Sequence, residues 1–318
     1  MSNFNPKPRG KERSDTLTPD MFEKLRREEV RVDEVGRATL TAWQDIWKRL
    51  TSNKLAMLGF WIIAALVVCC LVVPLIWPFD HYTTELTNTN QAPNGTHWFG
   101  TDELGRDMFE RVWKGAQISL FVGVVAALID LVLGVIYGGI MGYYGGKVDE
   151  VMNRFAEILY SIPYLLVVIL LLVVMEPSLT TIIVAMSITG WINMAWIVRG
   201  QIMQLKNQEY ALASKSLGAG AMRIIFRHLV PNAMGPILVT LTLTIPSAIF
   251  TEAFLSFLGL GVQSPAASWG TMIDDGVGGI FNYPWRLFFP AIFLSVTIFA
   301  FNVFGDGLRD AFDPKLKK

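Results

Sequence analysis

The sequence predicts an all-α, polytopic membrane protein with six transmembrane helices. Of its 318 residues, 52% are hydrophobic and only 17% are charged, and the mean hydropathy is +0.41. This composition is too apolar for an ordinary soluble domain. The apolar residues also gather in six runs, each long enough to cross a hydrocarbon core of about 30 Å. The runs are Leu55–Trp77, Ile118–Met141, Phe155–Met175, Thr180–Val198, Ile237–Val262 and Leu287–Phe304.

Basic residues outside these runs are distributed unevenly, and this predicts an orientation. Residues 1–54 contain twelve Lys or Arg, the loop 142–154 two, the segment 199–236 five and the C-terminal tail four, which places 23 on one face. The opposite loops carry four: Arg106, Arg111, Lys114 and Arg286. Because basic residues concentrate on the cytoplasmic side of a membrane protein, we expect both termini and the segment 199–236 to be cytoplasmic.

Residues 1–54 are polar and charged, without an apolar core near the start that would indicate a secretory signal. We expect disorder over about the first 20 residues and a short helix from about Pro19. The stretch Thr41–Leu50 is different, because its large apolar side chains share one helical face. They are Trp43, Ile46, Trp47 and Leu50. This pattern predicts an interfacial helix that lies on membrane lipid before the first span.

Small residues and prolines mark points of contact and bending within the spans. The second run contains Gly134, Gly138 and Gly142 at four-residue spacing, a ridge that lets another helix approach closely. Pro163 and Pro246 interrupt the third and fifth runs, where neighbouring groups must satisfy the freed carbonyls.

The segment Asn207–Pro236, between the fourth and fifth runs, has mixed polarity and predicts a short structured unit. Asn207 is a candidate N-cap, and Gly218 stands where a helix would end in a left-handed conformation. The resulting helix of about ten residues is marginal alone in water, so we expect it to lean on a partner. A basic segment, 219–228, follows, and we expect Pro231 to close it.

This segment resembles the cytoplasmic loop of the membrane permease subunits of bacterial ABC importers. The family pattern is Glu-Ala-Ala, three residues, Gly, nine residues, then Ile-x-Leu-Pro. With Gly218 aligned, Ala213 and Pro231 match the pattern, while the positions that depart are Leu212, Ser214, His228 and Val230. In that family the loop carries a coupling helix that sits in a groove of the ATPase subunit. The resemblance therefore implies a coupling loop at 203–236, with ATPase-coupling roles for Glu209, Ala213, Ser214, Leu217, Gly218 and Pro231.

Three other segments resemble the peptide-importer branch of the same family, and in particular the C-type permease subunit of oligopeptide and dipeptide importers. They are His97–Leu120, Thr251–Val262 and Phe304–Leu316. The resemblance runs from about Lys54 to the C-terminus and implies the type I, MetI-like importer permease fold. It divides the chain into a cytoplasmic tail with the interfacial helix (1–54), a first transmembrane helix with an external loop (55–116) and a transmembrane core domain (117–318).

The same resemblance implies a function and a set of partners. The chain is expected to be a non-catalytic permease subunit in a bacterial plasma membrane, which forms the translocation path for peptides together with a homologous permease. Two cytoplasmic ATPase subunits would bind ATP and Mg, so this chain is expected to bind no cofactor. An extracellular or periplasmic binding protein would deliver the peptide, with oligopeptides favoured.

Enzymatic, metal-binding and nucleic-acid functions find no support in the sequence. It lacks the Gly-x-x-x-x-Gly-Lys-Ser/Thr phosphate loop. His81, His97 and His228 are far apart and lack metal-ligand spacing. The adjacent Cys69 and Cys70 lie inside an apolar run and form no disulfide framework. The net charge is zero, which gives no bias toward nucleic acid. We therefore expect no catalytic and no metal-binding residues.

Two groups of charged residues are candidates for a role in transport. Asp130 and Glu252 lie inside predicted spans, where ionisable groups are costly and usually face a partner or a water-filled cavity. They border the translocation path, or they pair with a neighbouring helix or subunit. The external run Asp102, Glu103, Arg106, Asp107 and Glu110 is a solvated, self-paired helix or a cation site, and the helix is favoured. The first four of these residues are also candidates for docking the binding protein.

Two alternative functions remain open at this stage. In the first alternative, the importer carries nickel or another small solute in place of peptides, since nickel importers are close relatives of this branch. In the second alternative the chain is an ATP-independent channel or secondary transporter, in which Asp130 and Glu252 carry protons or ions. Inverted internal repeats would favour that second alternative, and none is visible in the sequence.

Overall fold

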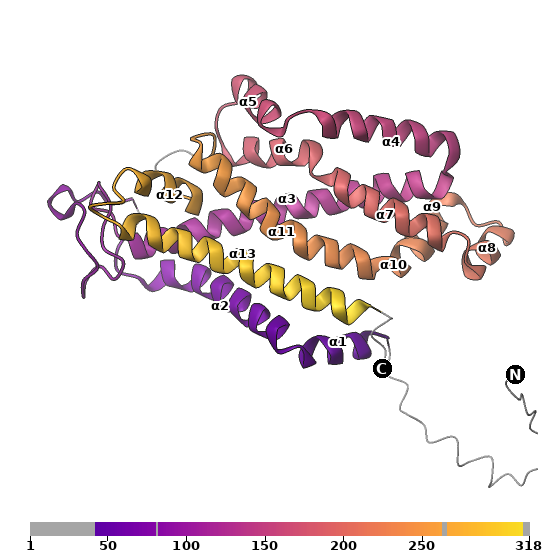
Figure 1. Cartoon of the computed structure of the whole chain (residues 1–318), viewed down its shortest axis with the longest axis horizontal. Coiled ribbons are helices and arrows are strands. Elements are labelled where there is room, and N and C mark those ends of the chain that lie inside the picture. The colour runs from indigo at the N-terminus through magenta and orange to yellow at the C-terminus, as the bar shows by residue number, and fades with distance from the viewer. Residues whose placement is uncertain (1–41, 81, 263–265, 314–318) are drawn as a thin grey trace, which may run out of the picture. The chain divides into compact units, whose positions relative to one another are not determined.

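A computed structural model describes residues 42–80, 82–262 and 266–313 of the chain (Figure 1). These residues form helices and connecting loops, with an isolated bridge between Thr101 and Asp107 as their only β-type pairing. The predicted all-α class is therefore confirmed. The predictions of early disorder and of a helix from about Pro19 lie outside the described residues.

Five helical segments of the described chain are long and apolar enough to cross a membrane. They are α2 (Lys54–Ile76), α3 (Met108–Tyr144), the continuous run of α6 (Leu179–Thr189) and α7 (Trp191–Leu205), α11 (Met234–Phe257) and α13 (Trp285–Phe312). A sixth span is present if the bent pair α4 (Gly146–Ser161) and α5 (Tyr164–Val174) is counted as one. The six predicted runs all fall on these segments.

The third predicted span, Phe155–Met175, is interrupted at Pro163 as predicted, and the interruption is a sharp bend between two helices. The chain turns by 78° between α4 and α5. Pro163 has no N–H to donate, and its ring disfavours the helical conformation at Ile162, which is extended with ψ 125°. The loop expected at 142–154 is also mostly helical, because α4 already begins at Gly146.

Close packing of α3 against α7 forms the centre of the bundle (Figure 1). A side chain at Gly138 would overlap the backbone of Ala195, and a Cβ at Gly142 would lie 2.8 Å from the carbonyl oxygen of Arg199. The predicted ridge of small residues is confirmed, since these glycines let α7 approach the backbone of α3. Helix α13 packs against α2 and α11, and it also contacts α12 (Trp269–Val277).

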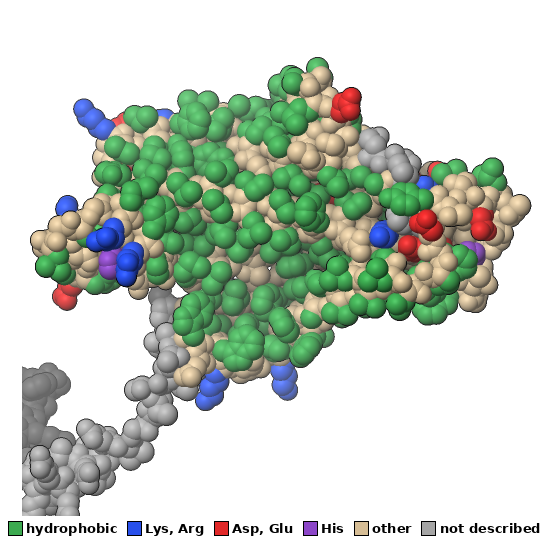
Figure 2. Space-filling model, turned by 180° about the vertical axis from the view of Figure 1, so that it is seen from behind, with side chains coloured by type: hydrophobic (Ala, Val, Ile, Leu, Met, Phe, Trp, Pro, Cys, Tyr) green, Lys and Arg blue, Asp and Glu red, His purple; other side chains and the backbone are tan. Residues whose placement is uncertain are grey.

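Large apolar side chains cover the outer surface of the helices. Figure 2 shows them across the middle of one face, with Lys, Arg, Asp and Glu concentrated toward its two ends. On α5, for example, Val173 and Val174 are 80% and 83% exposed. An apolar exterior bounded by charged ends is the pattern expected of a protein surrounded by lipid.

The predicted helix before the first span is confirmed as α1 (Ala42–Ser52). Its residue Leu50 is buried against Ala56 of α2 and Ala311 of α13, with Ile46 packed beside them. Trp47 is 60% exposed. The helix thus contacts the ends of two spans, and its contact with lipid stays a prediction.

Candidate functional site

The predicted coupling helix is present as α8 (Glu209–Ser216), but it begins one residue later than expected. Gln208, with φ −72° and ψ 150°, is the N-cap residue, and no side chain caps the first turn. The prediction of Asn207 as N-cap is therefore wrong. An N-cap side chain bonds the second or third N–H after it, and Asn207 lies one residue too far from the helix.

The end of α8 follows the predicted C-terminal signal. Gly218 has φ +83°, the left-handed conformation that glycine adopts most easily. The N–H of Ala219 donates to the carbonyl of Ser214, and the N–H of Gly218 donates to the carbonyl of Lys215. These two bonds form a Schellman motif, which reverses the chain sharply after the helix.

Helix α8 has an anchored side and an exposed side. Ala211 is buried in a cluster with Ile202 of α7 and Ile224. On the other side Leu217 is 89% exposed and Leu212 is 49% exposed. Of the residues assigned to ATPase coupling, Glu209, Ala213, Leu217, Gly218 and Pro231 are exposed and Ser214 is half-buried. They therefore lie where another protein could reach them, and the contact itself stays a prediction.

The chain after α8 stays helical through Pro231, so the expectation that this proline closes the segment is wrong. It passes through α9 (Ala221–Ile224), a π-helical turn η3 (Ile225–Leu229) and α10 (Val230–Asn232). Proline in a regular helix clashes with the carbonyl four residues before it. A π turn precedes this proline: the N–H of Val230 donates to the carbonyl of Ile225, five residues earlier. The backbone before Pro231 is therefore wider than in a regular α-helix.

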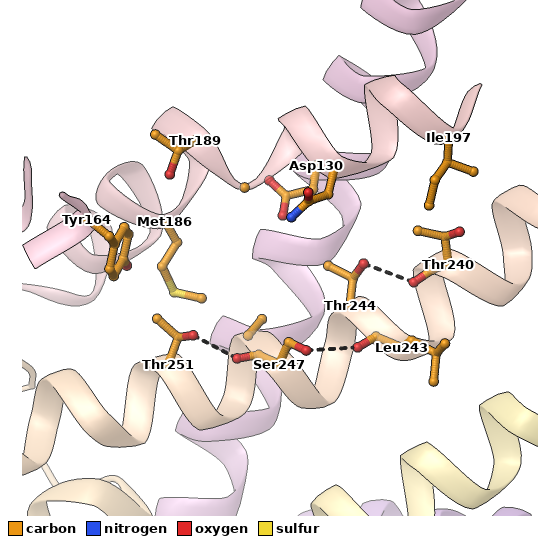
Figure 3. Close-up of a pocket in the computed structure, with 13 residues that line it drawn as sticks. Asp130, Tyr164, Met186, Thr189, Ile197, Thr240, Leu243, Thr244, Ser247 and Thr251 are labelled. Atoms are coloured by element: carbon orange, nitrogen blue, oxygen red, sulfur yellow. Dashed lines mark hydrogen bonds between the residues drawn. The ribbon is translucent and has the colours of Figure 1, made fainter. Parts of the chain in front are cut away.

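A cavity of about 390 Å³ lies between α3, α5, the α6–α7 run and α11 (Figure 3). Asp130 of α3 is part of its wall, and among the described residues that line the cavity it alone has a formally charged side chain. The lining residues are Asp130, Tyr164, Met186, Thr189, Gly190, Asn193, Ile197, Thr240, Leu243, Thr244, Ser247, Ala248 and Thr251. A role of Asp130 in a translocation path stays a prediction.

Sequence reasoning missed the hydroxyl side chains of α11 that line this cavity. Thr240, Thr244, Ser247 and Thr251 are separated by three or four residues, which places them on one face of a helix. That spacing was available in the sequence and could have indicated a polar face within the fifth span. Tyr164 was missed as well, because it stands at the start of an apolar run without a periodic signal.

Glu252 is placed differently from Asp130. It is fully buried and does not line the cavity, although its neighbour Thr251 does. Its carboxylate accepts hydrogen bonds from Ser119 of α3 at 2.8 Å and from Ser256 at 2.7 Å. These hydrogen bonds hold Glu252 to the neighbouring α3 and to its own helix α11. A role in the translocation path stays a prediction.

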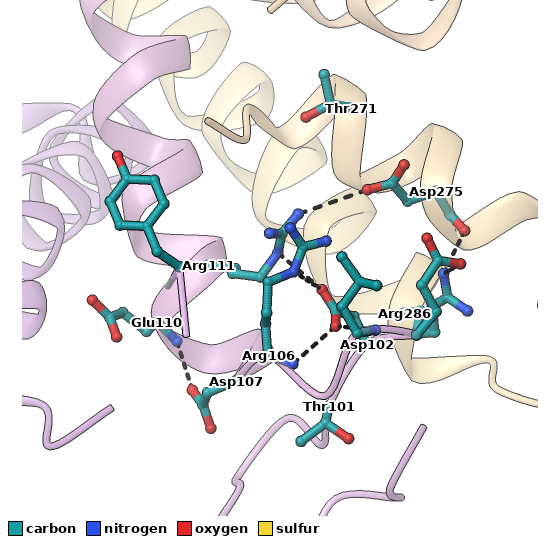
Figure 4. Close-up of polar contacts among 12 residues, drawn as sticks. Thr101, Asp102, Arg106, Asp107, Glu110, Arg111, Thr271, Asp275 and Arg286 are labelled. Atoms are coloured by element: carbon teal, nitrogen blue, oxygen red, sulfur yellow. Dashed lines mark hydrogen bonds and ion pairs between the residues drawn. The ribbon is translucent and has the colours of Figure 1, made fainter. Parts of the chain in front are cut away.

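The external segment before α3 is a loop with buried charges, and not the solvated helix that was expected (Figure 4). Asp102 Oδ1 accepts from the N–H groups of Leu104 and Arg106 at 2.8 and 2.9 Å. Its Oδ2 accepts from Nε of Arg106 at 2.6 Å and lies 3.4 Å from Nε of Arg111. Asp102 and Arg106 are buried, so they hold the loop together.

Asp107 is also buried and is the N-cap of the 37-residue α3. Its carboxylate accepts from the N–H of Glu110 at 2.9 Å and from the indole of Trp77 at 3.1 Å. The ring Nδ1 of His97 lies 2.8 Å from its other oxygen. One side chain thus joins the start of α3 to the end of α2 and to the external loop.

Glu103 is the one exposed side chain among the four docking candidates, at 52%. Its Oε2 accepts a hydrogen bond from Arg286 at 2.8 Å, and Arg286 also donates to the carbonyl of Asp275. Partial burial raises the pKa of the Asp275 carboxyl, and the guanidinium of Arg111, 3.7 Å away, opposes that rise. Among the described residues, no group of three or more His, Cys, Asp or Glu could hold a metal ion.

Comparison with known families gives two matches. Residues 131–318 match the family described as "Binding-protein-dependent transport system inner membrane component". Residues 41–93 match the "N-terminal TM domain of oligopeptide transport permease C".

Relatives match over nearly the whole chain. An oligopeptide transport system permease protein of Bacillus subtilis (strain 168) is 57% identical over 302 residues, which cover 95% of this chain and 99% of the relative. A dipeptide transport system permease protein of the same strain is 57% identical, with 94% of each chain covered. An oligopeptide transport system permease protein of Escherichia coli (strain K12) is 43% identical over 86% of this chain and 91% of the relative. A chain of the inward-facing MetNI methionine ABC transporter is similar in structure, with a TM-score of 0.49, 18% identity and coverage of 65% of this chain and 98% of that chain.

Proposed function

The chain belongs to the binding-protein-dependent transport system inner membrane components, the permease subunits of ABC importers, and we propose that it carries peptides, with oligopeptides favoured, across a bacterial plasma membrane. Relatives that are 57% identical over almost the full chain are named for oligopeptide and dipeptide transport. The chain lines the translocation path together with a homologous permease subunit.

The observation that carries this function is the geometry of α8. Its inner side is fixed to α7 through Ala211, while Leu212 and Leu217 stay exposed at the end of the bundle. An exposed apolar surface on a rigidly held short helix is suited to a protein partner. That partner is a cytoplasmic ATPase subunit, two of which bind and hydrolyse ATP with Mg. This chain binds no cofactor and catalyses no reaction.

The charge distribution supports an orientation for this assembly. In Figure 1, α8 and the C-terminal end of α13 lie at one end of the helices, while α12 and the loop before α3 lie at the other. The end with α8 is cytoplasmic, since the basic residues concentrate there. The opposite end receives a peptide-binding protein, and Glu103 is the exposed member of the four docking candidates.

A labelling experiment tests the orientation. In a variant whose Cys69 and Cys70 are replaced by alanine, a cysteine at Gly95 should react with an impermeant thiol reagent in intact cells. A cysteine at Lys215 should react only after the cells are opened. The reverse pattern would contradict the orientation.

Reconstitution tests the function itself. The chain should copurify with a homologous permease and two ATPase subunits, and proteoliposomes of this complex should accumulate labelled peptide only when ATP and the loaded binding protein are present. Uptake of Ni²⁺ without uptake of peptide would support the nickel alternative. Peptide uptake without ATP would support a channel or secondary transporter.

A further inference from the structure

One wall of the cavity beside Asp130, the hydroxyl face of α11, accepts hydrogen bonds and donates few. The hydroxyl of Thr240 donates to the carbonyl of Pro236 at 2.8 Å, and that of Thr244 donates to Thr240 at 2.9 Å. Ser247 and Thr251 donate in the same way to the carbonyls four residues before them. A hydroxyl has one proton to donate and two lone pairs. With its proton committed to its own helix, each of these side chains offers the cavity acceptor capacity only (Figure 3).

Asp130 adds a carboxyl group to this acceptor-rich wall. The residue is 6% exposed, and its Oδ1 has no hydrogen-bond partner among the described residues. A buried carboxylate without a donor is costly, and native structures normally provide one. Gly190 lies against the carboxylate, where a Cβ would come within 2.5 Å of Oδ2. This glycine therefore leaves room for the charged group beside the α6–α7 junction.

A second buried polar atom in the same wall also lacks a partner. The phenolic oxygen of Tyr164, on α5, has no hydrogen-bond partner among the described residues. Two buried polar atoms without a hydrogen-bond partner among the described residues thus line one cavity from different helices, which suits a polar ligand. A ligand that donates hydrogen bonds and carries positive charge complements the carboxyl group of Asp130 and the hydroxyl acceptors of α11. A primary ammonium group has three donors and no acceptor.

We propose that Asp130 and the hydroxyl face of α11 bind the N-terminal ammonium group of the peptide during its passage through the permease. This proposal rests on the function proposed above and names the part of the solute that the cavity recognises. A charge-assisted hydrogen bond to a carboxylate is stronger than a neutral one. The cavity should therefore favour a peptide with a free N-terminus over the same peptide acetylated there by about tenfold.

Occupancy of the cavity can be measured without the binding protein, which could select peptides itself. Asn193 lines the cavity and is exposed, so a cysteine at this position reports access to it. In the purified complex, with Cys69 and Cys70 replaced by alanine, trialanine should slow modification of Asn193→Cys. N-acetyl-trialanine should require about ten times the concentration for the same protection.

Substitutions at Asp130 identify the group that makes the distinction. In Asp130→Asn the two peptides should protect equally, at the concentration that the acetylated peptide needs in the parent. Asp130→Glu keeps the charge and should restore the preference. Asp306→Asn is the matched control, because Asp306 is an exposed carboxylate of α13 away from the cavity, and it should keep the parental preference. Unchanged elution of each complex in size-exclusion chromatography shows that assembly is intact.

Several outcomes would overturn the inference. They are equal protection by the two peptides in the parent, protection by neither, a parallel loss for both in Asp130→Asn, or protection by Ni²⁺ alone. Loss of the partner permease from the Asp130→Asn complex would show instead that the carboxylate pairs with that subunit. The proposed function is judged separately by peptide uptake into proteoliposomes. A parental complex that transports peptide but lacks the Asp130-dependent preference retains the function and loses the inference.

Discussion

The hydroxyl of Ser119 donates a hydrogen bond of 2.8 Å to the carboxylate of Glu252, although 133 positions separate the two residues. Both side chains are fully buried, so this bond joins α3 to α11 inside the bundle. The same hydroxyl lies 3.4 Å from the backbone N–H of Trp269, which begins α12. One buried serine and one carboxylate therefore connect three helices.

We predict that Glu252→Ala destabilises the protein more than Asp130→Ala does. Removing the Glu252 carboxylate leaves the buried hydroxyls of Ser119 and Ser256 without an acceptor and opens a void. Together these effects should cost about 2–4 kcal/mol. Removing the unpartnered carboxylate of Asp130 costs no hydrogen bond among the described residues. Thermal unfolding of the detergent-solubilised complex should show the larger decrease in melting temperature for Glu252→Ala, and equal decreases would contradict this account.

A second prediction concerns the approach of α7 to α3. In Gly138→Val the new side chain would meet the backbone of Ala195, which cannot move without shifting α7. Overpacking of this kind typically costs about 1–3 kcal/mol. The variant should accumulate at a lower level in the membrane and melt at a lower temperature than the parent.

Gly200→Ala is the control for that experiment. Gly200 is also helical and belongs to α7, but a Cβ there meets no atom within 4 Å. Alanine is the better helix former by about 1 kcal/mol. This variant should match or exceed the parent in melting temperature. A similar loss in both variants would show that close helix contact does not explain the ridge of glycines.

A third prediction separates the external charges into two classes. Asp102→Ala removes the acceptor of two backbone N–H groups and leaves the guanidinium of Arg106 buried without its partner. The loss should be about 3–5 kcal/mol, seen as a low yield of folded protein. Glu103→Ala removes a half-exposed carboxylate, and its buried partner Arg286 keeps hydrogen bonds to Asn90 and to the carbonyl of Asp275, so the loss of stability should be smaller than for Asp102→Ala.

The Glu103 variant should therefore fold normally and show its defect in docking. Hydrolysis of ATP by the complex should need a higher concentration of loaded binding protein for half-maximal stimulation. The difference from the parent should shrink as salt is added, because exposed charges are screened. Normal stimulation at low salt would remove Glu103 from the docking surface.

The sequence predicted features that depend on neighbours along the chain. The spans are continuous apolar runs, and the end of α8 follows from a glycine placed after a short polar helix. Contacts between distant segments could not be read in this way. Nothing near Glu252 in sequence identifies Ser119 as its partner, and the charged run around Asp102 has the composition of a solvated helix although it is buried.

The bend in the third span could be predicted only in part from the sequence. Pro163 was visible as an interruption, but proline alone does not fix the size of a bend. Pro246 stands inside α11, which continues past it, whereas Pro163 separates two helices that differ in direction by 78°. Charged residues give α4 a polar side. A span that faced lipid along its whole length would not carry such a side.

The final prediction concerns the turn after α8 and uses two glycines of similar exposure. A Cβ at Gly218 or at Gly220 would meet no atom within 4 Å, so neither position is limited by space. They differ in backbone conformation, because Gly218 has φ +83° whereas Gly220 has φ −68°. Gly218→Val should therefore strain the Schellman turn by about 1 kcal/mol or more, while Gly220→Ala should be tolerated.

The two variants should behave alike in the membrane and differ in coupling. Both should insert and pair with the homologous permease, since α8 ends outside the spans. In Gly218→Val the helix should leave its docked position, so the complex should lose ATPase subunits or lose the stimulation of hydrolysis by loaded binding protein. Ala213→Trp should have the same effect by filling the exposed side of α8, as Ala213 is itself exposed. If hydrolysis and peptide uptake remain coupled as in the parent in both Gly218→Val and Ala213→Trp, α8 is not the element that transmits ATP hydrolysis to the permease.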